Sequence, residues 1–156
     1  MMYHLLSFFL KLLSYIPFGV LYFLSDGLFC LLYYVIRYRR RVVRKNLTES
    51  FPEKSERDIL QLEKKFYHFF TDQVLESCKM ASISPEEIKR RMTFKNMEKV
   101  NAVLREGKSI ALYMGHYGNW EWVSSFPLWL EENALAVQIY HKLSNENMDR
   151  LILHNR

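Results

Sequence analysis

The chain opens with two apolar segments that a short polar break separates. The first is Leu5–Leu13, which Lys11 interrupts, and the second is Ile16–Ile36. The second segment is close to the roughly 20 residues that a helix needs to cross the hydrocarbon core of a bilayer. Asp26 and Gly27 lie near its centre, and an aspartate there costs about 2.5–3.5 kcal/mol on translocon insertion scales. The pattern predicts a membrane-inserting helical segment, which either spans the bilayer or enters it as a tilted or re-entrant helix.

A run of basic residues follows directly, comprising Arg37, Arg39, Arg40, Arg41, Arg44 and Lys45. The positive-inside rule places everything after residue 36 on the cytoplasmic side, and the same charges attract anionic lipid head groups. A cleaved signal peptide is a competing interpretation, although the start of the chain has no basic region and no small-residue cleavage site. A core hairpin of a soluble protein is another. We favour a retained anchor with its basic flank over residues 1–45, followed by a separate domain over residues 46–156.

Three helices are predicted after the basic run. Ser55 begins the first with a capping-box pattern, and apolar residues then recur at helical spacing to about Met80. Ser84 begins the second, with a proline at the first helical position and Glu87 closing the capping box. Asn96 caps the third, which ends at Gly107.

The last third of the chain predicts strands between helices. Ser109–Met114 and Ala134–Tyr140 have the apolar character of buried strands, and Met92–Lys95 has that of a short edge strand. Trp120–Leu130 and Asn145–Arg156 have helical patterns. A strand, a helix and a returning strand form a parallel, right-handed βαβ unit. The predicted fold class is therefore α/β, with a helical, membrane-inserting segment at the N-terminus.

Charge and cysteine content exclude some classes of function. The formal net charge is +5, from 22 basic and 17 acidic residues. This small, diffuse excess suits an anionic membrane surface or an acidic carrier protein, and it does not support binding to nucleic acid. Cys30 and Cys78 lack metal-ligand spacing, and both are predicted to be buried free thiols. No set of residues suggests a metal site.

The richest chemistry lies at residues 114–121, where the sequence is Met-Gly-His-Tyr-Gly-Asn-Trp-Glu. His116 would lie just after the end of the predicted strand. Gly118 permits a backbone conformation that other residues resist, and Asn119 is a good helix cap. Glu121 then falls in the first helical turn, where the helix dipole favours a negative charge. A neutral imidazole can accept a proton from a hydroxyl while a carboxylate orients the ring. The plainer interpretation is an ordinary loop histidine followed by an ordinary first-turn acid.

This block resembles the signature of the bacterial lipid A biosynthesis acyltransferases, within the lysophospholipid acyltransferase-like group. Weaker matches in the same order extend over nearly the whole chain, at Arg39–Arg41, Arg44–Leu47, Phe51–Pro52, Asn96–Glu98, Ile139–Tyr140 and Asn147–Arg150. The resemblance implies a sheet with helices on both faces. It also implies a protein of about twice this length. We therefore expect these residues to be the N-terminal part of a longer enzyme, so that the chain is truncated.

The resemblance implies direct acyl transfer without a cofactor. His116 would act as general base on a hydroxyl of a glycolipid acceptor, and Glu121 would hold and charge-balance it. The deprotonated oxygen would attack the thioester of an acyl carrier protein. The amides of Gly118 and Asn119 are candidate donors to the oxyanion that forms.

Substrate-binding residues follow from the same resemblance. Arg150 and Arg156 match basic positions that could grip acceptor phosphates, and Trp120 is a candidate contact for the acyl chain. The implied partners are acyl carrier protein, a lipid A precursor or another glycolipid, and the membrane. The implied location is the inner membrane, with the catalytic part on the cytoplasmic side. An acyltransferase for another lysolipid and a noncatalytic membrane-bound fragment are the alternatives.

Overall fold

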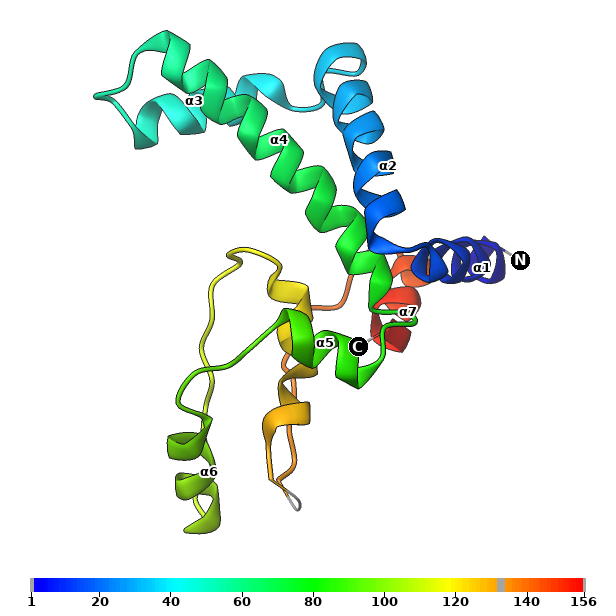
Figure 1. Cartoon of the computed structure of the whole chain (residues 1–156), viewed down its shortest axis with the longest axis vertical. Coiled ribbons are helices and arrows are strands. Elements are labelled where there is room, and N and C mark those ends of the chain that lie inside the picture. Colours follow the sequence, from blue (N-terminus) through cyan, green and yellow to red (C-terminus); the bar gives the residue numbers. More distant parts are fainter. Residues whose placement is uncertain (1, 132–133, 156) are drawn as a thin grey trace. The chain divides into compact units, whose positions relative to one another are not determined.

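In the computed structural model, residues 2–131 and 134–155 are described, and every regular element among them is a helix (Figure 1). The elements are α1 (Met2–Tyr15), α2 (Phe18–Cys30), the π-helix η1 (Leu31–Val35), α3 (Arg40–Ser50), α4 (Glu56–Lys79), α5 (Pro85–Arg91), α6 (Met97–Arg105), the 3₁₀ helix η2 (Trp120–Trp129) and α7 (Glu146–Asn155). They fall into two compact units. One comprises residues 16–76, and the other comprises residues 1–15 and 77–156. The boundary at residue 45 stays a prediction.

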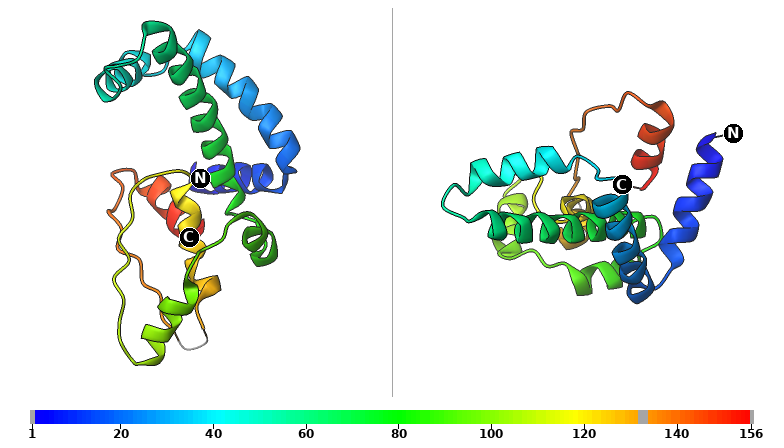
Figure 2. Two further views of the ribbon diagram at one scale, coloured as in Figure 1. Left: turned by 60° about the vertical axis from the view of Figure 1, so that its left-hand side comes forward. Right: turned by 90° about the horizontal axis from the view of Figure 1, so that it is seen from above.

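The predicted α/β fold is wrong for the described part of the chain. Residues 92–95, 109–114 and 134–140, expected to be strands, have irregular backbone, so no βαβ unit forms. The views in Figure 2 show the segment between α6 and η2 as a loop, and Tyr113 within it is 93% exposed. A helix satisfies its hydrogen bonds internally, whereas a strand needs a neighbouring strand. These segments have the composition of strands but no such neighbour among the described residues.

The unit of residues 16–76 begins with the candidate membrane helix. α2 starts after Pro17 and continues through η1, so that Phe18–Val35 is long and apolar enough to cross a membrane. Asp26 and Gly27 do not interrupt it. Its buried residues recur every fourth position and therefore share one helix face; they are Leu21, Ser25, Phe29 and Tyr33. Cys30 lies off this face and is exposed, so its predicted burial is wrong.

A helical hairpin of α3 and α4 completes this unit. The predicted start of α4 is confirmed, because the Asp58 amide donates to Ser55 Oγ over 3.3 Å. Phe29, Tyr33 and Tyr67 form the buried cluster of the unit, and Val43 of α3 packs against it. The core thus joins the candidate membrane helix to both helices of the hairpin.

In the other unit, local capping signals are largely confirmed. Ser84 Oγ accepts the Glu87 amide over 3.2 Å at the start of α5, and Pro85 occupies the first helical position. Gly107 ends α6 with a φ of +74° and donates its amide to the Leu104 carbonyl, as glycine does at many helix ends. Asn96 precedes α6 as predicted, but its side chain makes no capping hydrogen bond.

Buried polar contacts attach α1 within the same unit. α1 packs against α7, and the carbonyl of Ser14 near its end accepts from Lys79 Nζ over 2.6 Å and from Ser82 Oγ over 2.8 Å. Burial lowers the pKa of the Lys79 ammonium. A cation at a helix C-terminus complements the partial negative charge of the last carbonyls.

Candidate functional site

The predicted catalytic histidine lies in a tight turn. The Tyr117 amide donates to the Gly115 carbonyl over 2.9 Å, which closes a three-residue turn with His116 at its centre. Gly118 follows with a φ of +61°, a left-handed conformation that glycine adopts without a steric penalty. His116 is exposed. The local sequence therefore presents this imidazole to solvent.

The imidazole of His116 contacts Trp120. The two ring centroids are 4.3 Å apart and the planes meet at 64°, an edge-to-face arrangement. Glu121, the next residue, is half-buried in the first turn of η2. The structure thus brings His116 to Trp120, and the His116–Glu121 dyad stays a prediction.

The helix after the turn is a 3₁₀ helix. Asn119 precedes it, and the Trp122 amide donates to the Asn119 carbonyl over 3.1 Å. Ser124 Oγ and Ser125 Oγ donate to carbonyls of the preceding turn, over 2.7 and 2.6 Å. The predicted oxyanion donors, the amides of Gly118 and Asn119, lie at the N-terminal end of η2, where the helix dipole favours negative charge.

Asn101 of α6 anchors the far end of η2, and the sequence interpretation missed it. Its Nδ2 donates to the Trp129 carbonyl over 3.3 Å, and its Oδ1 accepts the Glu131 amide over 3.4 Å. The Trp129 ring also packs edge-on against Phe94 at 4.9 Å between centroids. Asn101 is buried, and it lies on the same face of α6 as apolar residues. A polar residue on the apolar face of a helix is the signal that could have identified it.

Arg150 and Arg156, the predicted phosphate-binding residues, stay predictions. Arg150 is exposed on α7. Arg156 lies outside the described residues. Asp149 of α7 is buried, and its carboxylate accepts the Leu143 amide over 2.8 Å, which ties α7 to the preceding segment.

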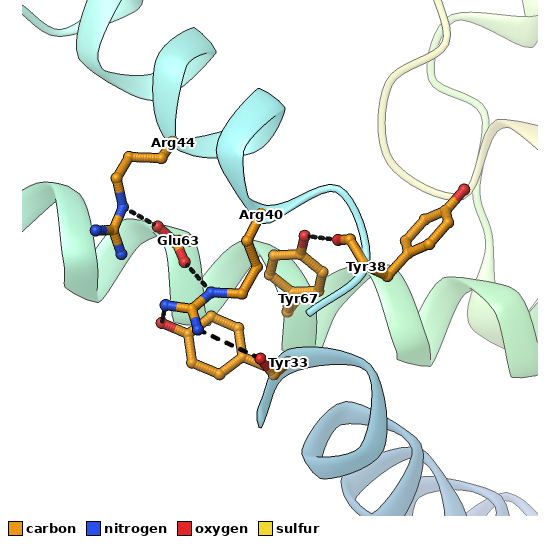
Figure 3. A network of polar contacts seen from close by, with 6 residues as sticks. All are labelled: Tyr33, Tyr38, Arg40, Arg44, Glu63 and Tyr67. Atoms are coloured by element: carbon orange, nitrogen blue, oxygen red, sulfur yellow. Dashed lines mark hydrogen bonds and ion pairs between the residues drawn. The ribbon is translucent and has the colours of Figure 1, made fainter. Parts of the chain in front are cut away.

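A second polar cluster lies in the unit of residues 16–76 (Figure 3). Glu63 of α4 is fully buried and accepts from Arg40 Nε over 2.8 Å and from Arg44 Nε over 2.6 Å. The Arg40 guanidinium also lies 4.1 Å from the centroid of the Tyr33 ring and donates to its hydroxyl over 3.2 Å. The Tyr67 hydroxyl donates to the Tyr38 carbonyl. One carboxylate thereby attaches the basic helix α3 to α4.

The charge state of Glu63 follows from these contacts. Burial alone would raise the pKa of Glu63, but hydrogen bonds from Arg44 and Arg40 outweigh burial and hold the pKa below its ordinary value. The sequence interpretation assigned the arginines to membrane orientation and lipid head groups, and it missed Glu63. Glu63 falls between Ile59 and Tyr67 at four-residue spacing on the buried face of α4, and an acid at such a position indicates a buried partner.

Comparison with known proteins identifies the family of the chain. The whole chain, residues 1–156, matches the family model described as bacterial lipid A biosynthesis acyltransferase. No curated protein and no solved structure matches the chain.

Proposed function

The chain belongs to the bacterial lipid A biosynthesis acyltransferase family, and on that premise we propose that it transfers a fatty acyl chain from an acyl carrier protein thioester to a hydroxyl of a lipid A precursor. The family resemblance predicted from the sequence is confirmed, and the family is one of acyltransferases. The observation that supports the proposed chemistry best is the exposed His116 imidazole, held in a tight turn and braced by Trp120.

In the proposed mechanism, His116 accepts the proton of the acceptor hydroxyl. The oxygen attacks the thioester carbonyl carbon, and the amides of Gly118 and Asn119 donate to the oxyanion of the tetrahedral intermediate. Collapse of the intermediate breaks the C–S bond and forms the new ester. The departing thiolate takes the proton from the imidazolium of His116, which returns the base to its starting state. Glu121 orients the imidazole and stabilises its charged form.

The proposed setting is the cytoplasmic side of the inner membrane. The apolar helix Phe18–Val35 supports membrane attachment, and the exposed arginines beyond it favour the cytoplasmic side. In this setting Arg150 and Arg156 would bind acceptor phosphates and Trp120 would contact the acyl chain. No cofactor is needed, because the thioester supplies the activated acyl group.

An acylation assay with labelled acyl carrier protein and a tetra-acylated lipid A precursor tests the proposal. We expect His116→Ala to lower the rate by about 10²–10⁴-fold, the usual contribution of general base catalysis. His141→Ala is the matched control, because His141 is also exposed and lies outside the turn; it should retain wild-type activity. Equal activity of His116→Ala and His141→Ala would rule out the general-base role.

The acceptor class needs a separate comparison. We expect the wild-type protein to acylate the lipid A precursor faster than a lysophospholipid at equal surface concentration. Preference for the lysophospholipid would refute the proposed acceptor and leave the dyad chemistry standing. No acylation of either acceptor by the wild-type protein would identify it as noncatalytic.

A further inference from the structure

The candidate membrane helix has two faces with different surroundings. On one face, Phe29 and Tyr33 are buried in the core of the unit. The other face is apolar and uncovered: Phe23 is 76% exposed and Val35 is 72% exposed. Its other exposed apolar residues include Val20, Leu24 and Leu31. Soluble proteins rarely leave a continuous apolar surface of this kind in water.

Contacts with α4 run along the covered face in antiparallel order. Four contacts link the helices: Tyr22 with Glu76 (2.7 Å), Asp26 with His68 (3.5 Å), Phe29 with His68 (3.6 Å between centroids) and Tyr33 with Tyr67 (5.3 Å between centroids). The partner on α4 is Glu76 at the start of this series, His68 for the two middle contacts, and Tyr67 at its end. These contacts join the part of α4 between Tyr67 and Glu76 to the covered face of α2 and η1.

That region of α4 carries charged side chains as well as exposed apolar ones. Lys64 and Lys65 are exposed, and Asp72 is half-exposed. If Phe18–Val35 crossed the bilayer with its α4 contacts intact, these charges would enter the hydrocarbon region, where ionised side chains are expensive. A crossing helix would therefore have to separate from α4 and lose these contacts.

Asp26 fits the same reasoning. It lies near the middle of the apolar segment, where a spanning helix would place it at the bilayer centre. Its carboxylate instead lies 3.5 Å from His68 Nδ1, on the side that faces α4. A helix lying along the membrane surface keeps this pair near water.

The chain turns sharply after the apolar segment. Arg37 and Arg39 both have positive φ, at 57° and 51°, and α3 begins directly afterwards. Arg37, Arg39 and Arg41 are exposed, and in the part of the chain that the structure describes none of them forms an ion pair. Three cations at the end of an apolar helix complement the phosphates of an anionic lipid surface.

We propose that α2 and η1 form a monotopic membrane-docking surface, which lies in one leaflet of an anionic bilayer without crossing it. The face with Phe23 and Val35 contacts the acyl chains, as the apolar face of an interfacial helix does. α4 covers the opposite face from the aqueous side, and Arg37, Arg39 and Arg41 contact lipid phosphates. Both ends of α2–η1 then lie on the same side of the membrane. This inference concerns membrane topology and stands independently of the proposed catalytic chemistry.

Sidedness of the N-terminus tests the proposal against a spanning helix. A hydrophilic epitope tag is fused ahead of Met1 in the full chain, and a control tag is inserted between Glu53 and Lys54, in the turn between α3 and α4. Protease is added to spheroplasts and to inverted inner-membrane vesicles. We expect both tags to be cut only in the inverted vesicles. Cleavage of the N-terminal tag in spheroplasts, with the control tag protected, would overturn the proposal.

Depth of insertion tests the proposal against a soluble hairpin. A polarity-sensitive fluorophore is attached to Phe23→Cys, and in the matched control to Lys64→Cys, both in full chains that carry Cys30→Ala and Cys78→Ala. With phosphatidylethanolamine–phosphatidylglycerol vesicles, we expect a lipid-soluble quencher to reduce emission at position 23 and not at position 64. An aqueous spectrum at position 23, or equal quenching at both positions, would overturn it.

The arginines are tested by vesicle binding. Replacing Arg37, Arg39 and Arg41 together with glutamine should weaken partitioning into phosphatidylglycerol-containing vesicles at low salt by on the order of 100-fold. Binding to uncharged phosphatidylcholine vesicles should stay within a few-fold of wild type. Unchanged partitioning into the anionic vesicles would remove the lipid-phosphate contact from the proposal.

Discussion

The Glu63→Gln substitution tests the attachment of the basic helix to α4. Gln keeps the size of the side chain and removes the charge that Arg40 and Arg44 share. Glu63 is fully buried and accepts hydrogen bonds from both guanidinium groups at 2.6–2.8 Å. The substitution therefore weakens two charge-assisted hydrogen bonds. We expect a lower free energy of unfolding and a more mobile α3.

The magnitude follows from how exposed each arginine is. A hydrogen bond to a charged group contributes about 1.5–3 kcal/mol to stability. Arg40 is only 26% exposed, so we expect its hydrogen bond to Glu63 to contribute an energy in this range. Arg44 is 49% exposed, so its share is discounted towards the roughly 0–1 kcal/mol of surface pairs. The expected loss for Glu63→Gln is about 2–3 kcal/mol, below the roughly 3–5 kcal/mol found when a fully buried pair is broken.

Urea denaturation of the detergent-solubilised protein, followed by far-ultraviolet circular dichroism, measures this loss. Glu49→Gln is the matched control, because Glu49 pairs with Lys45 at 3.7 Å with both side chains exposed. We expect the control to change stability by less than about 0.5 kcal/mol. Equal stability of the two variants would refute the reasoning that burial makes the Glu63 contacts strong.

The pH dependence provides an independent check with a definite sign. The pKa of Glu63 in the folded protein lies below its ordinary value of 4.5. Its contribution is therefore complete above about pH 4.5 and is lost as the pH falls through the folded pKa. The stability difference between wild type and Glu63→Gln should shrink as the pH is lowered from 5 towards 3. A difference that stays constant over that interval would contradict the assignment.

Three further substitutions test local features. Ser84→Ala should lower stability by about 1 kcal/mol through loss of the α5 cap, whereas Ser84→Asp should retain it; equal urea midpoints for all three proteins would exclude a capping role. Asn101→Ala should cost about 1–3 kcal/mol, because two backbone groups near Trp129 lose their partner, and limited proteolysis should then cut after η2 sooner than in the wild-type protein. Gly118→Ala should cost about 1–2 kcal/mol because its φ is +61°, while Gly115→Ala, without a positive φ and with open space at its Cβ, should cost less. Equal urea midpoints for the two glycine variants would contradict the conformational argument.

Helix boundaries were largely predictable from sequence because their signals are local. The caps at Ser55 and Ser84 and the glycine stop at Gly107 act on backbone groups within a few residues, so the sequence around each one contains the information. The predicted helix at the end of the chain is observed as Glu146–Asn155. The turn at His116 is local in the same way. The pairing of His116 with Glu121 depends on side-chain packing and stays a prediction.

The strands failed because strand formation is not local. Ser109–Met114 has the apolar composition of a buried strand, yet its backbone is irregular in the structure. Apolar composition indicates that a segment tends to be buried. Only a partner strand can supply the hydrogen bonds that make the segment a strand. The sequence interpretation inferred that partner from a second apolar segment, and the described structure does not pair the two.

From sequence alone, this protein's family, its helical starts and stops and its membrane-seeking segment could be determined, since each is written in contiguous residues. The tertiary structure decided which charges are buried and what lies beside the apolar helix. Glu63 is one acid among many on α4 until α3 folds back and brings Arg40 and Arg44 against it. Likewise, Phe18–Val35 is a spanning candidate by length, and only its contacts with α4 show which of its faces is covered. Both outcomes depend on residues distant in the chain, whose approach depends on the free energy of packing and not on local conformational preference.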